Sequence, residues 1–313
     1  MPISNTNSIV VGQMIRGVSA IAFGDGQGFT QNSTLYTVTL VDVANDTLIS
    51  KAVVNHTYFV SPPVIGGVAG WRAFTEGCCR LSPPSHINNP DVGIRITTLV
   101  NLGVPTAQSP VSGISPIVDC PKSALCLFQV PAIAPPSQTI SYRFANTTEA
   151  SDGQGFFRQP GQHPAASPDP VIDFTTGIYS WNPTGATLAP AGTNTLYSTQ
   201  VIVEGRIGAA LVSWIAVDFF IRLSDTASPD RPPVFVAPTL PEGTILTTTV
   251  GAAPVTFDVA ASDPDTGDTV TLGMLGMPVD ATFAPTAGNP ATGTFTWTPA
   301  SAGAAILTLT AQD

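Results

Sequence analysis

Three aspartates lie close together near the C-terminal end of the chain, in the run Asp263-Pro264-Asp265-Thr266-Gly267-Asp268. Carboxylate oxygens are the ligands that Ca²⁺ prefers, and the ion takes about six to eight of them. The mutual repulsion of clustered carboxylates also favours a bound cation. Since Asp, Pro and Gly are turn residues in any case, the alternative is an ordinary solvated turn. The run is therefore a candidate calcium site.

Four cysteines offer a second kind of chemistry: the adjacent Cys78 and Cys79, and Cys120 and Cys126 in the run DCPKSALC. Three disulfide pairings are open to them. A bond between Cys120 and Cys126 closes a short loop and would stabilise the fold by about 2–3 kcal/mol in the loop-entropy model. It leaves Cys78 and Cys79 to pair with each other, which is uncommon for neighbouring residues. We favour this pairing over a cross-link between the two pairs. Zinc is disfavoured because there is no C-x-x-C run and the three histidines are scattered.

The sequence contains no recognisable catalytic motif. G-x-S-x-G, H-E-x-x-H and the Walker loop do not occur. Glu76, Glu149, Glu204 and Glu242 show no grouping, although a carboxylate pair for glycoside hydrolysis is left open. We expect the chain not to be an enzyme.

Charge and hydropathy exclude two classes of partner. The formal net charge is −10 and lysine occurs only at Lys51 and Lys122, so neither nucleic acid nor an anionic lipid surface is expected. The longest apolar run, 211–221, contains Asp218 and is shorter than the roughly 20 residues of a membrane-spanning helix. We therefore expect no membrane insertion. The first residues lack the basic start and apolar core of a signal peptide, which leaves the location open.

Alternation of apolar and polar residues predicts strands throughout the chain, for example at 94–102, 255–259 and 307–311. The run 211–223 is apolar on both faces, so we expect it to be covered on both sides. The 30 prolines and 28 glycines suit tight turns, and 43% hydrophobic residues are enough for packed cores. The predicted fold class is all-β, built of sandwich domains.

Composition changes suggest three modules. A polar, proline-rich bridge lies at 224–233, and a weaker seam lies at 103–116. We expect a β-rich N-terminal module at 1–108, an Ig-like sandwich at 109–227 and a cadherin-like or Ig-like sandwich at 228–313.

One phrase occurs twice, as TGIYSWNPT at 176–184 and TGTFTWTPA at 292–300. An aromatic residue followed two positions later by Trp puts both rings on one face of a strand. We interpret Tyr179 with Trp181, and Phe295 with Trp297, as core anchors, because large aromatics on a strand face are usually buried. The alternative is a platform on which sugars stack.

The last module resembles the bacterial cadherin-like and Ig-like repeats of large surface proteins. The acidic turn 261–268, the G-x-F-x-W-x-P segment 293–299 and the closing Ala-Gln-Asp at 311–313 carry this resemblance, which extends more loosely over 109–227. It implies tandem Ig-like or cadherin-like β-sandwiches arranged as a rod. It also implies that calcium ligands from the bridge join those of the turn, giving the set Asp225, Asp230, Asp263, Asp265 and Asp268. Resemblance of this kind indicates architecture far better than function.

We therefore expect a non-enzymatic, extracellular or cell-surface structural protein, either a segment of an adhesin or the subunit of a surface fibre. Its partners would be further copies of itself or neighbouring repeats. The apolar stretch Ile9 to Ile21 could add as a strand to a neighbour's sheet edge, or could simply be the first strand of its own module. Glycans are expected at the sequons Asn32, Asn45, Asn55 and Asn146. The alternative function is a carbohydrate-binding or accessory region of a secreted enzyme.

Overall fold

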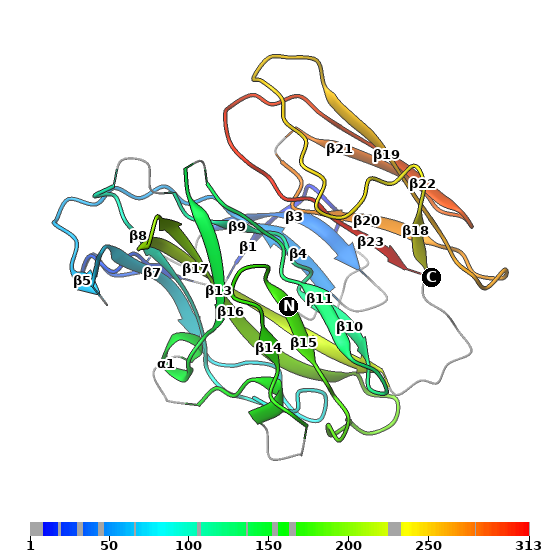
Figure 1. Ribbon diagram of the computed structural model, residues 1–313, viewed down its shortest axis with the longest axis horizontal. Helices are drawn as coiled ribbons and strands as arrows, with labels where there is room; N and C mark the ends of the chain where they lie inside the picture. The colour runs from blue at the N-terminus through cyan, green and yellow to red at the C-terminus, as the bar shows by residue number, and fades with distance from the viewer. Residues whose placement is uncertain are drawn as a thin grey trace. The chain divides into compact units, whose positions relative to one another are not determined.

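The chain is almost entirely β in the computed structural model, which describes residues 9–17, 20–29, 34–42, 47–65, 67–104, 108–135, 137–151, 156–162, 167–224, 233–278 and 280–312 (Figure 1). Within these residues, helix is confined to α1 (Thr147–Ala150) and a 3-10 turn at Pro160–Gln162. The predicted all-β class is thus confirmed. The chain divides into two compact units, here called unit 1 (Met1–Thr226) and unit 2 (Ala227–Asp313).

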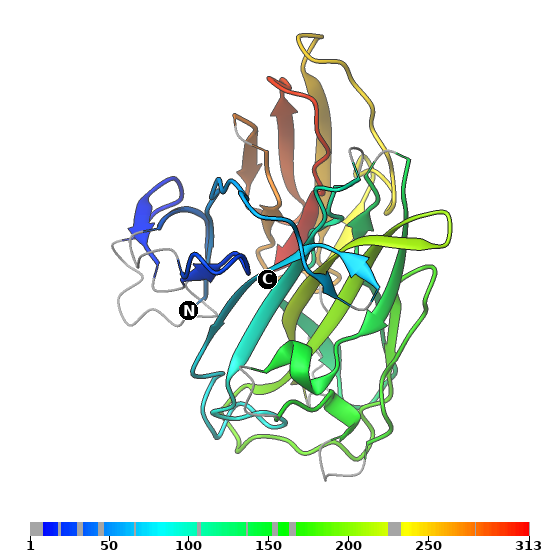
Figure 2. The ribbon, with the colours of Figure 1, turned by 90° about the vertical axis from the view of Figure 1, so that its left-hand side faces the viewer.

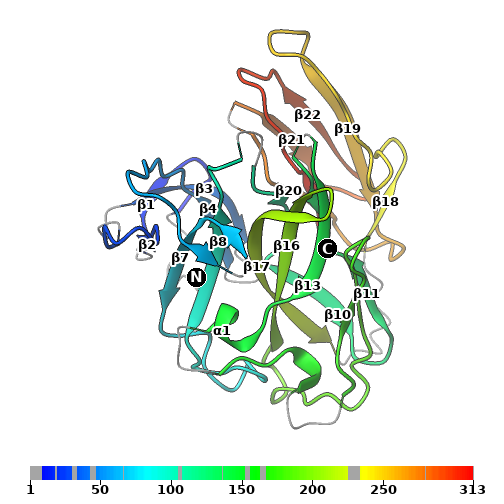
Figure 3. The same cartoon turned by 60° about the vertical axis from the view of Figure 1, so that its left-hand side comes forward.

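A large central sheet forms the framework of unit 1. Its strands follow the order β13-β16-β17-β8-β7-β2, and β10 pairs in parallel with the C-terminal end of β17. Their bounds are β2 Ile21–Ala22, β7 Trp71–Gly77, β8 Ile94–Val100, β10 Ile117–Pro121, β13 Thr139–Phe144, β16 Thr195–Ile207 and β17 Ala210–Ser224. The long hairpin β16–β17 lies at the centre of the sheet (Figure 3). It turns at Gly208, whose φ of 59° suits a tight hairpin and favours glycine.

Strand β17 is covered on both faces, as its two apolar faces predicted. Side chains alternate between the faces of a strand. Phe219 and Ile221 belong to the core cluster on one face, whereas Trp214 packs with Leu99 and Phe157 in a cluster on the other. Helix α1 lies against β8 (Figure 2) and adds a buried alanine to the second cluster.

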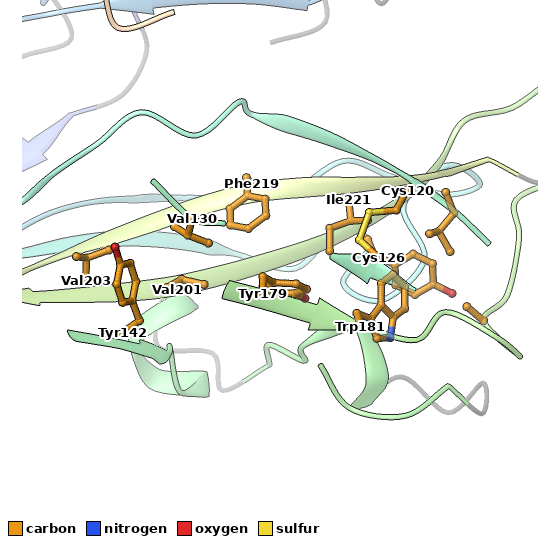
Figure 4. Packing of buried hydrophobic residues seen from close by; sticks show 13 residues of the cluster. Cys120, Cys126, Val130, Tyr142, Tyr179, Trp181, Val201, Val203, Phe219 and Ile221 are labelled. Carbon is orange, nitrogen blue, oxygen red and sulfur yellow. A yellow bond between two sulfur atoms is a disulfide. The ribbon is translucent and has the colours of Figure 1, made fainter. Parts of the chain in front are cut away.

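A smaller sheet supplies the second layer of the sandwich. Its strands follow the order β11-β15-β14, with bounds β11 Cys126–Gln129, β14 Val171–Ile172 and β15 Ile178–Trp181. Tyr179 and Trp181 project from β15 into the core, where Tyr179 lies near Val201 and Phe219 of the central sheet (Figure 4).

Three further small sheets complete the described part of unit 1. They are β1-β3-β4, with β1 Met14–Arg16, β3 Leu35–Asp42 and β4 Thr47–Lys51; β5-β6, with β5 Val64–Ile65 and β6 Val68–Ala69; and β9-β12, with β9 Val111–Ser112 and β12 Ala132–Ile133. The stretch Ile9 to Ile21 therefore contains a strand, β1, that pairs antiparallel with β3 of its own chain.

The structure does not separate residues 1–108 from 109–227, where the sequence suggested a boundary. Strand β8 pairs with β17 through Leu99↔Trp214 and Thr98↔Ile215, so segments from both sides of that boundary form one sheet. The cluster around Trp214 likewise draws its side chains from both sides. Removing either segment would expose the other's core, and this is why the two form one compact unit.

Unit 2 is a small sandwich of two sheets. The larger follows the order β18-β19-β22-β21 and the smaller pairs β20 with β23. The bounds are β18 Val234–Val236, β19 Val255–Ser262, β20 Thr271–Leu275, β21 Thr282–Thr286, β22 Ala291–Trp297 and β23 Thr308–Gln312. If the six strands β18 to β23 are lettered A to F in chain order, one sheet has the order A-B-E-D and the other pairs C with F. The first six strands of an immunoglobulin-type sandwich are divided between its sheets in the same way. The core is centred on Val259, Ala261 and Phe295.

Candidate metal centre

The acidic turn begins where strand β19 leaves the core of unit 2. Along the first part of β19 exposed and covered side chains alternate, with Thr256 and Asp258 exposed; Val259 and Ala261 are buried in the core, and the small Ala260 on the other face is buried as well. Asp263 continues the inward-facing series one residue beyond the strand and is only 7% exposed. The alternation that directs side chains into the core of the sandwich thus also buries this carboxylate.

Asn289 holds the turn in shape. Its Oδ1 accepts a hydrogen bond from the backbone N–H of Asp263 (3.0 Å), and its Nδ2 donates to the backbone oxygens of Asp263 (3.1 Å) and Asp265 (3.3 Å). Within the turn, the N–H of Asp265 donates to Asp263 Oδ1 (2.7 Å) and the N–H of Asp268 donates to the oxygen of Asp265 (3.2 Å). Sequence reasoning missed Asn289, since it comes from a distant loop and its only local signal is the turn-forming pair Asn-Pro.

The three carboxylates converge. One oxygen each from Asp263, Asp265 and Asp268 can be chosen so that all lie within 4.8 Å of one another, and no other such group of acidic, His or Cys side chains occurs among the described residues. Asp263 Oδ2 is buried and accepts no hydrogen bond there. A buried carboxylate oxygen without a partner is costly, and a cation is one remedy. The donor set of hard oxygens therefore fits Ca²⁺, although three carboxylates supply only part of its usual shell.

The other two predicted ligands, Asp225 and Asp230, lie outside the described residues. Their contribution to a metal centre stays a prediction.

The two disulfides lie in contrasting surroundings. Cys120 bonds to Cys126, the pairing that the sequence favoured, and both residues are buried in the aromatic core of unit 1 (Figure 4). Cys78 bonds to Cys79 directly after β7, and both of these residues are exposed.

The repeated phrase fills cores in both units. Tyr179, Trp181 and Phe295 are each at most 1% exposed, and Trp297 is half-buried against the core of unit 2. Trp181 also donates from Nε1 to the backbone oxygen of Pro168 (3.1 Å). The interpretation as core anchors is confirmed for the three fully buried rings, which are inaccessible to a sugar.

The glycine of the phrase serves the same purpose in both copies. A Cβ at Gly177 would lie 2.6 Å from the ring of Tyr142, and one at Gly293 would lie 2.8 Å from the ring of Phe283. An aromatic ring of a neighbouring segment thus covers each glycine, so the phrase encodes a packing contact as well as two ring positions.

Unit 1 contains a buried polar network that sequence reasoning missed. Arg80 forms a bidentate ion pair with Asp218 of β17 (2.8 and 2.6 Å), and Gln200 Nε2 donates to the same carboxylate (2.9 Å). His86 lies beside it, with Nδ1 3.0 Å from the oxygen of Leu81 and Nε2 3.0 Å from Ser198 Oγ. The pairs Arg80–Asp218 and His86–Ser198 each join residues more than a hundred positions apart, so they leave no local pattern in the sequence.

The contact between His86 and Ser198 resembles half of a hydrolase site but cannot act as one. Ser198 is fully buried, and its Oγ also accepts a hydrogen bond from Asn89 Nδ2 (2.8 Å). Burial lowers the pKa of His86 to about 4, with the nearby Arg80 acting in the same direction. This pKa leaves the ring neutral near pH 7, and a buried hydroxyl offers substrate no approach. The contact is structural.

Two glutamates do come together, through an arginine. Arg143 donates to Glu149 (2.8 and 2.7 Å) and to Glu204 (2.9 Å), and Arg206 also donates to Glu204 (2.6 Å). Burial acts to raise the pKa of each carboxyl, but the hydrogen bonds from arginine outweigh it and both pKa values are lowered. A glycosidase needs one carboxyl with a raised pKa as its acid. This pair therefore suits an ion network rather than hydrolysis.

The candidate glycosylation sites divide into two groups. Asn55 and Asn146 are exposed, and Asn146 also caps α1 by accepting from the N–H of Glu149 (3.0 Å). Asn32 and Asn45 lie outside the described residues.

A hollow of about 320 Å³ lies over the outer face of the larger sheet of unit 2, between Pro238, Asp258 and Thr294. The carboxylate of Asp258 accepts a hydrogen bond from Thr294 Oγ1 (2.7 Å).

None of the helices in the described parts of the chain has the length and apolar character needed to cross a membrane.

Comparison with known proteins points to one group of relatives. Residues 2–103 match a family model described as the N-terminal part of integrin beta-like proteins A–E, and this match covers less than half of the chain. Integrin beta-like protein A of Dictyostelium discoideum is 27% identical over 220 residues, which cover 68% of this chain and 10% of the relative. The chain thus spans about a tenth of the relative's length. Neither comparison names the bacterial cadherin-like repeats, so that resemblance remains an interpretation.

Proposed function

We propose that this chain is a non-enzymatic module of an extracellular adhesion protein. The likeness to integrin beta-like protein A, which extends over 220 residues, is the observation that carries the proposal. The match of residues 2–103 to the integrin beta-like N-terminal model points to the same group of proteins. An all-β sandwich with aromatic cores suits a surface module that presents loops and edges to a partner.

Of the two forms of this proposal, we favour a segment of a longer adhesin beside neighbouring repeats over the subunit of a fibre. A fibre grown by strand addition needs a strand that is free to leave its own chain. Strand β1 is paired with β3, and the N–H of Gly12 also donates to the oxygen of Val38 (2.8 Å). Donating this stretch would cost those hydrogen bonds.

A cell-attachment assay tests the adhesion proposal. Beads coated with the purified full chain should retain cells against flow, and beads coated with albumin should not. A chain carrying Tyr179→Asp serves as a matched control, because a charge at this fully buried position disrupts the core of unit 1. Equal retention by all three coatings would refute the proposal.

We further propose that Ca²⁺ binds the acidic turn through Asp263, Asp265 and Asp268, joined by Asp225 and Asp230 from the bridge. The orphaned oxygen of Asp263 supports the first part. Sites of this kind in extracellular modules bind at roughly 10⁻⁴ to 10⁻³ M. Bound Ca²⁺ would neutralise the repulsion among the carboxylates and stiffen the turn between β19 and β20.

Calorimetric titration of the full chain with CaCl₂ tests this site. Asp263→Asn should weaken binding by about tenfold or more, since it removes a charged ligand and its unpartnered oxygen. Asp258→Asn, on the exposed face of the same strand, should leave binding unchanged. The double variant Asp225→Asn/Asp230→Asn tests whether the bridge contributes ligands in addition to those of the turn. Identical isotherms for the wild type and Asp263→Asn would rule out the turn as the site.

The alternative, a carbohydrate-binding region, draws less support. Three of the four aromatic rings in the repeated phrase are buried, and stacking on a sugar needs exposed rings. A glycan array probed with the full chain tests it directly, and saturable binding to one glycan class would favour this alternative.

A further inference from the structure

We propose that the Cys78–Cys79 disulfide is a thiol-exchange site, which small aliphatic thiols open and close while the rest of unit 1 stays folded. The first observation is exposure. Cys78 and Cys79 follow directly on β7 and both residues are exposed. Cys120 and Cys126, by contrast, are 4% and 1% exposed.

Access decides which disulfide reacts. A thiolate must reach one sulfur of the bond before it can displace the other. Cys126 is packed in the same cluster as Trp181 and Tyr197, so attack there requires local opening of the core. No such opening is needed at Cys78–Cys79. Within one compact unit, a thiol reagent can therefore reach the Cys78–Cys79 disulfide directly but not the Cys120–Cys126 disulfide.

The second observation is that the chain is anchored on both sides of the exposed pair. Before it, β7 pairs with β8 as far as Gly77↔Ile94. After it, the N–H of Arg80 donates to the oxygen of Val92 (2.8 Å), and the guanidinium, in a residue only 5% exposed, is paired with Asp218. Opening the bond frees no segment beyond the two cysteines themselves. Reduction therefore leaves the surrounding backbone in place, ready to bring the two sulfurs together again.

The chemistry balances with a thiol as the only co-reactant. A thiolate RS⁻ attacks one sulfur, the S–S bond breaks, and a mixed disulfide forms while the other cysteine leaves as a thiolate. A second thiol attacks the mixed disulfide and releases RSSR. Two protons from the two thiols end on Cys78 and Cys79, and the two electrons that the cysteines gain come from oxidation of 2 RSH to RSSR. The reverse sequence restores the bond.

Limited reduction of the full chain tests the assignment. The native protein is incubated with reduced glutathione near pH 8, quenched with iodoacetamide at intervals, and digested for mass spectrometry. Peptides with Cys78 and Cys79 should gain the label at least about tenfold faster than those with Cys120 and Cys126, which corresponds to about 1.4 kcal/mol of opening free energy. The tryptophan bands of the near-ultraviolet circular dichroism, which report on the aromatic cores, should stay constant while only the first pair is labelled.

Two variants sharpen the test. Cys78→Ser/Cys79→Ser should abolish the fast phase of labelling and leave the slow phase unchanged. Cys120→Ala/Cys126→Ala should retain the fast phase, and a folding defect in this variant would not affect the first comparison. Labelling of Cys78 or Cys79 without reductant, equal rates for the two pairs, or loss of the tryptophan bands during the fast phase would each overturn the proposal.

Discussion

Protonation of one buried histidine should make unit 1 less stable in mild acid. His86 is 1% exposed, and burial, the largest cause, lowers its pKa from 6.5 to about 4. Its ring fills a polar pocket in which Leu81 offers a carbonyl at Nδ1 and Ser198 a hydroxyl at Nε2. The carbonyl at Nδ1 favours the neutral tautomer with its proton there, and Nε2 then accepts from the hydroxyl.

The direction and size of this effect on stability follow from the linkage between proton binding and folding. Between pH 6.5 and 4 the unfolded chain binds a proton at this residue and the folded chain does not. The free energy of unfolding therefore falls as the pH falls through this window, and the contribution of His86 is flat outside it. Two and a half pH units at about 1.4 kcal/mol each give an upper limit of about 3.5 kcal/mol.

Urea unfolding between pH 7.5 and 4 measures this contribution. Trp297→Phe provides the background, because the remaining three of the four tryptophans then report on unit 1 alone. His86→Gln keeps a polar group near Ser198 but cannot titrate, so its stability should depend less steeply on pH between 6.5 and 4. His56→Gln is the matched control, since His56 pairs with Asp25 (2.7 Å) away from this pocket. If His86→Gln and the parent showed the same slope in this window, the assignment of a depressed pKa would be wrong.

Two further predictions concern packing. Arg80→Met leaves the carboxylate of Asp218 buried without its cation and should lower the free energy of unfolding by about 3–5 kcal/mol. In the double variant Arg80→Met/Asp218→Leu much of this loss should be recovered, and urea unfolding that showed the double variant to be the less stable would contradict the reasoning. In unit 2, Gly293→Ala pushes a methyl group against the ring of Phe283 and should cost about 1–3 kcal/mol. Gly303→Ala, where the added Cβ meets open space, should cost less, and equal thermal midpoints for the two would refute the packing argument.

Local patterns in the sequence determined the type of element and the chemistry of the turns. Alternation at 94–102 predicted a strand, and β8 occupies Ile94–Val100. The pattern did not settle which face is buried: Thr97 and Leu99 are 4% and 1% exposed, whereas the more apolar face with Ile94, Ile96 and Val100 is only half-buried. The reason is that period-two alternation fixes only that two faces differ, and the neighbouring layers decide which of them is covered.

The candidate metal centre, too, was predictable from the sequence only in part. The spacing of Asp263, Asp265 and Asp268 was visible in the chain, because a turn brings near neighbours together whatever surrounds it. The clamp from Asn289 was not visible, and neither were the pairing of Arg80 with Asp218 and that of His86 with Ser198. A polar group can be buried only where a partner from another strand meets it, and strand pairing between distant segments is set by the packing of the whole core. The sequence by itself thus determined that the chain is all-β and where its acidic turn lies. Only the tertiary structure decided that residues on both sides of position 108 share one sheet, and which polar groups that sheet encloses.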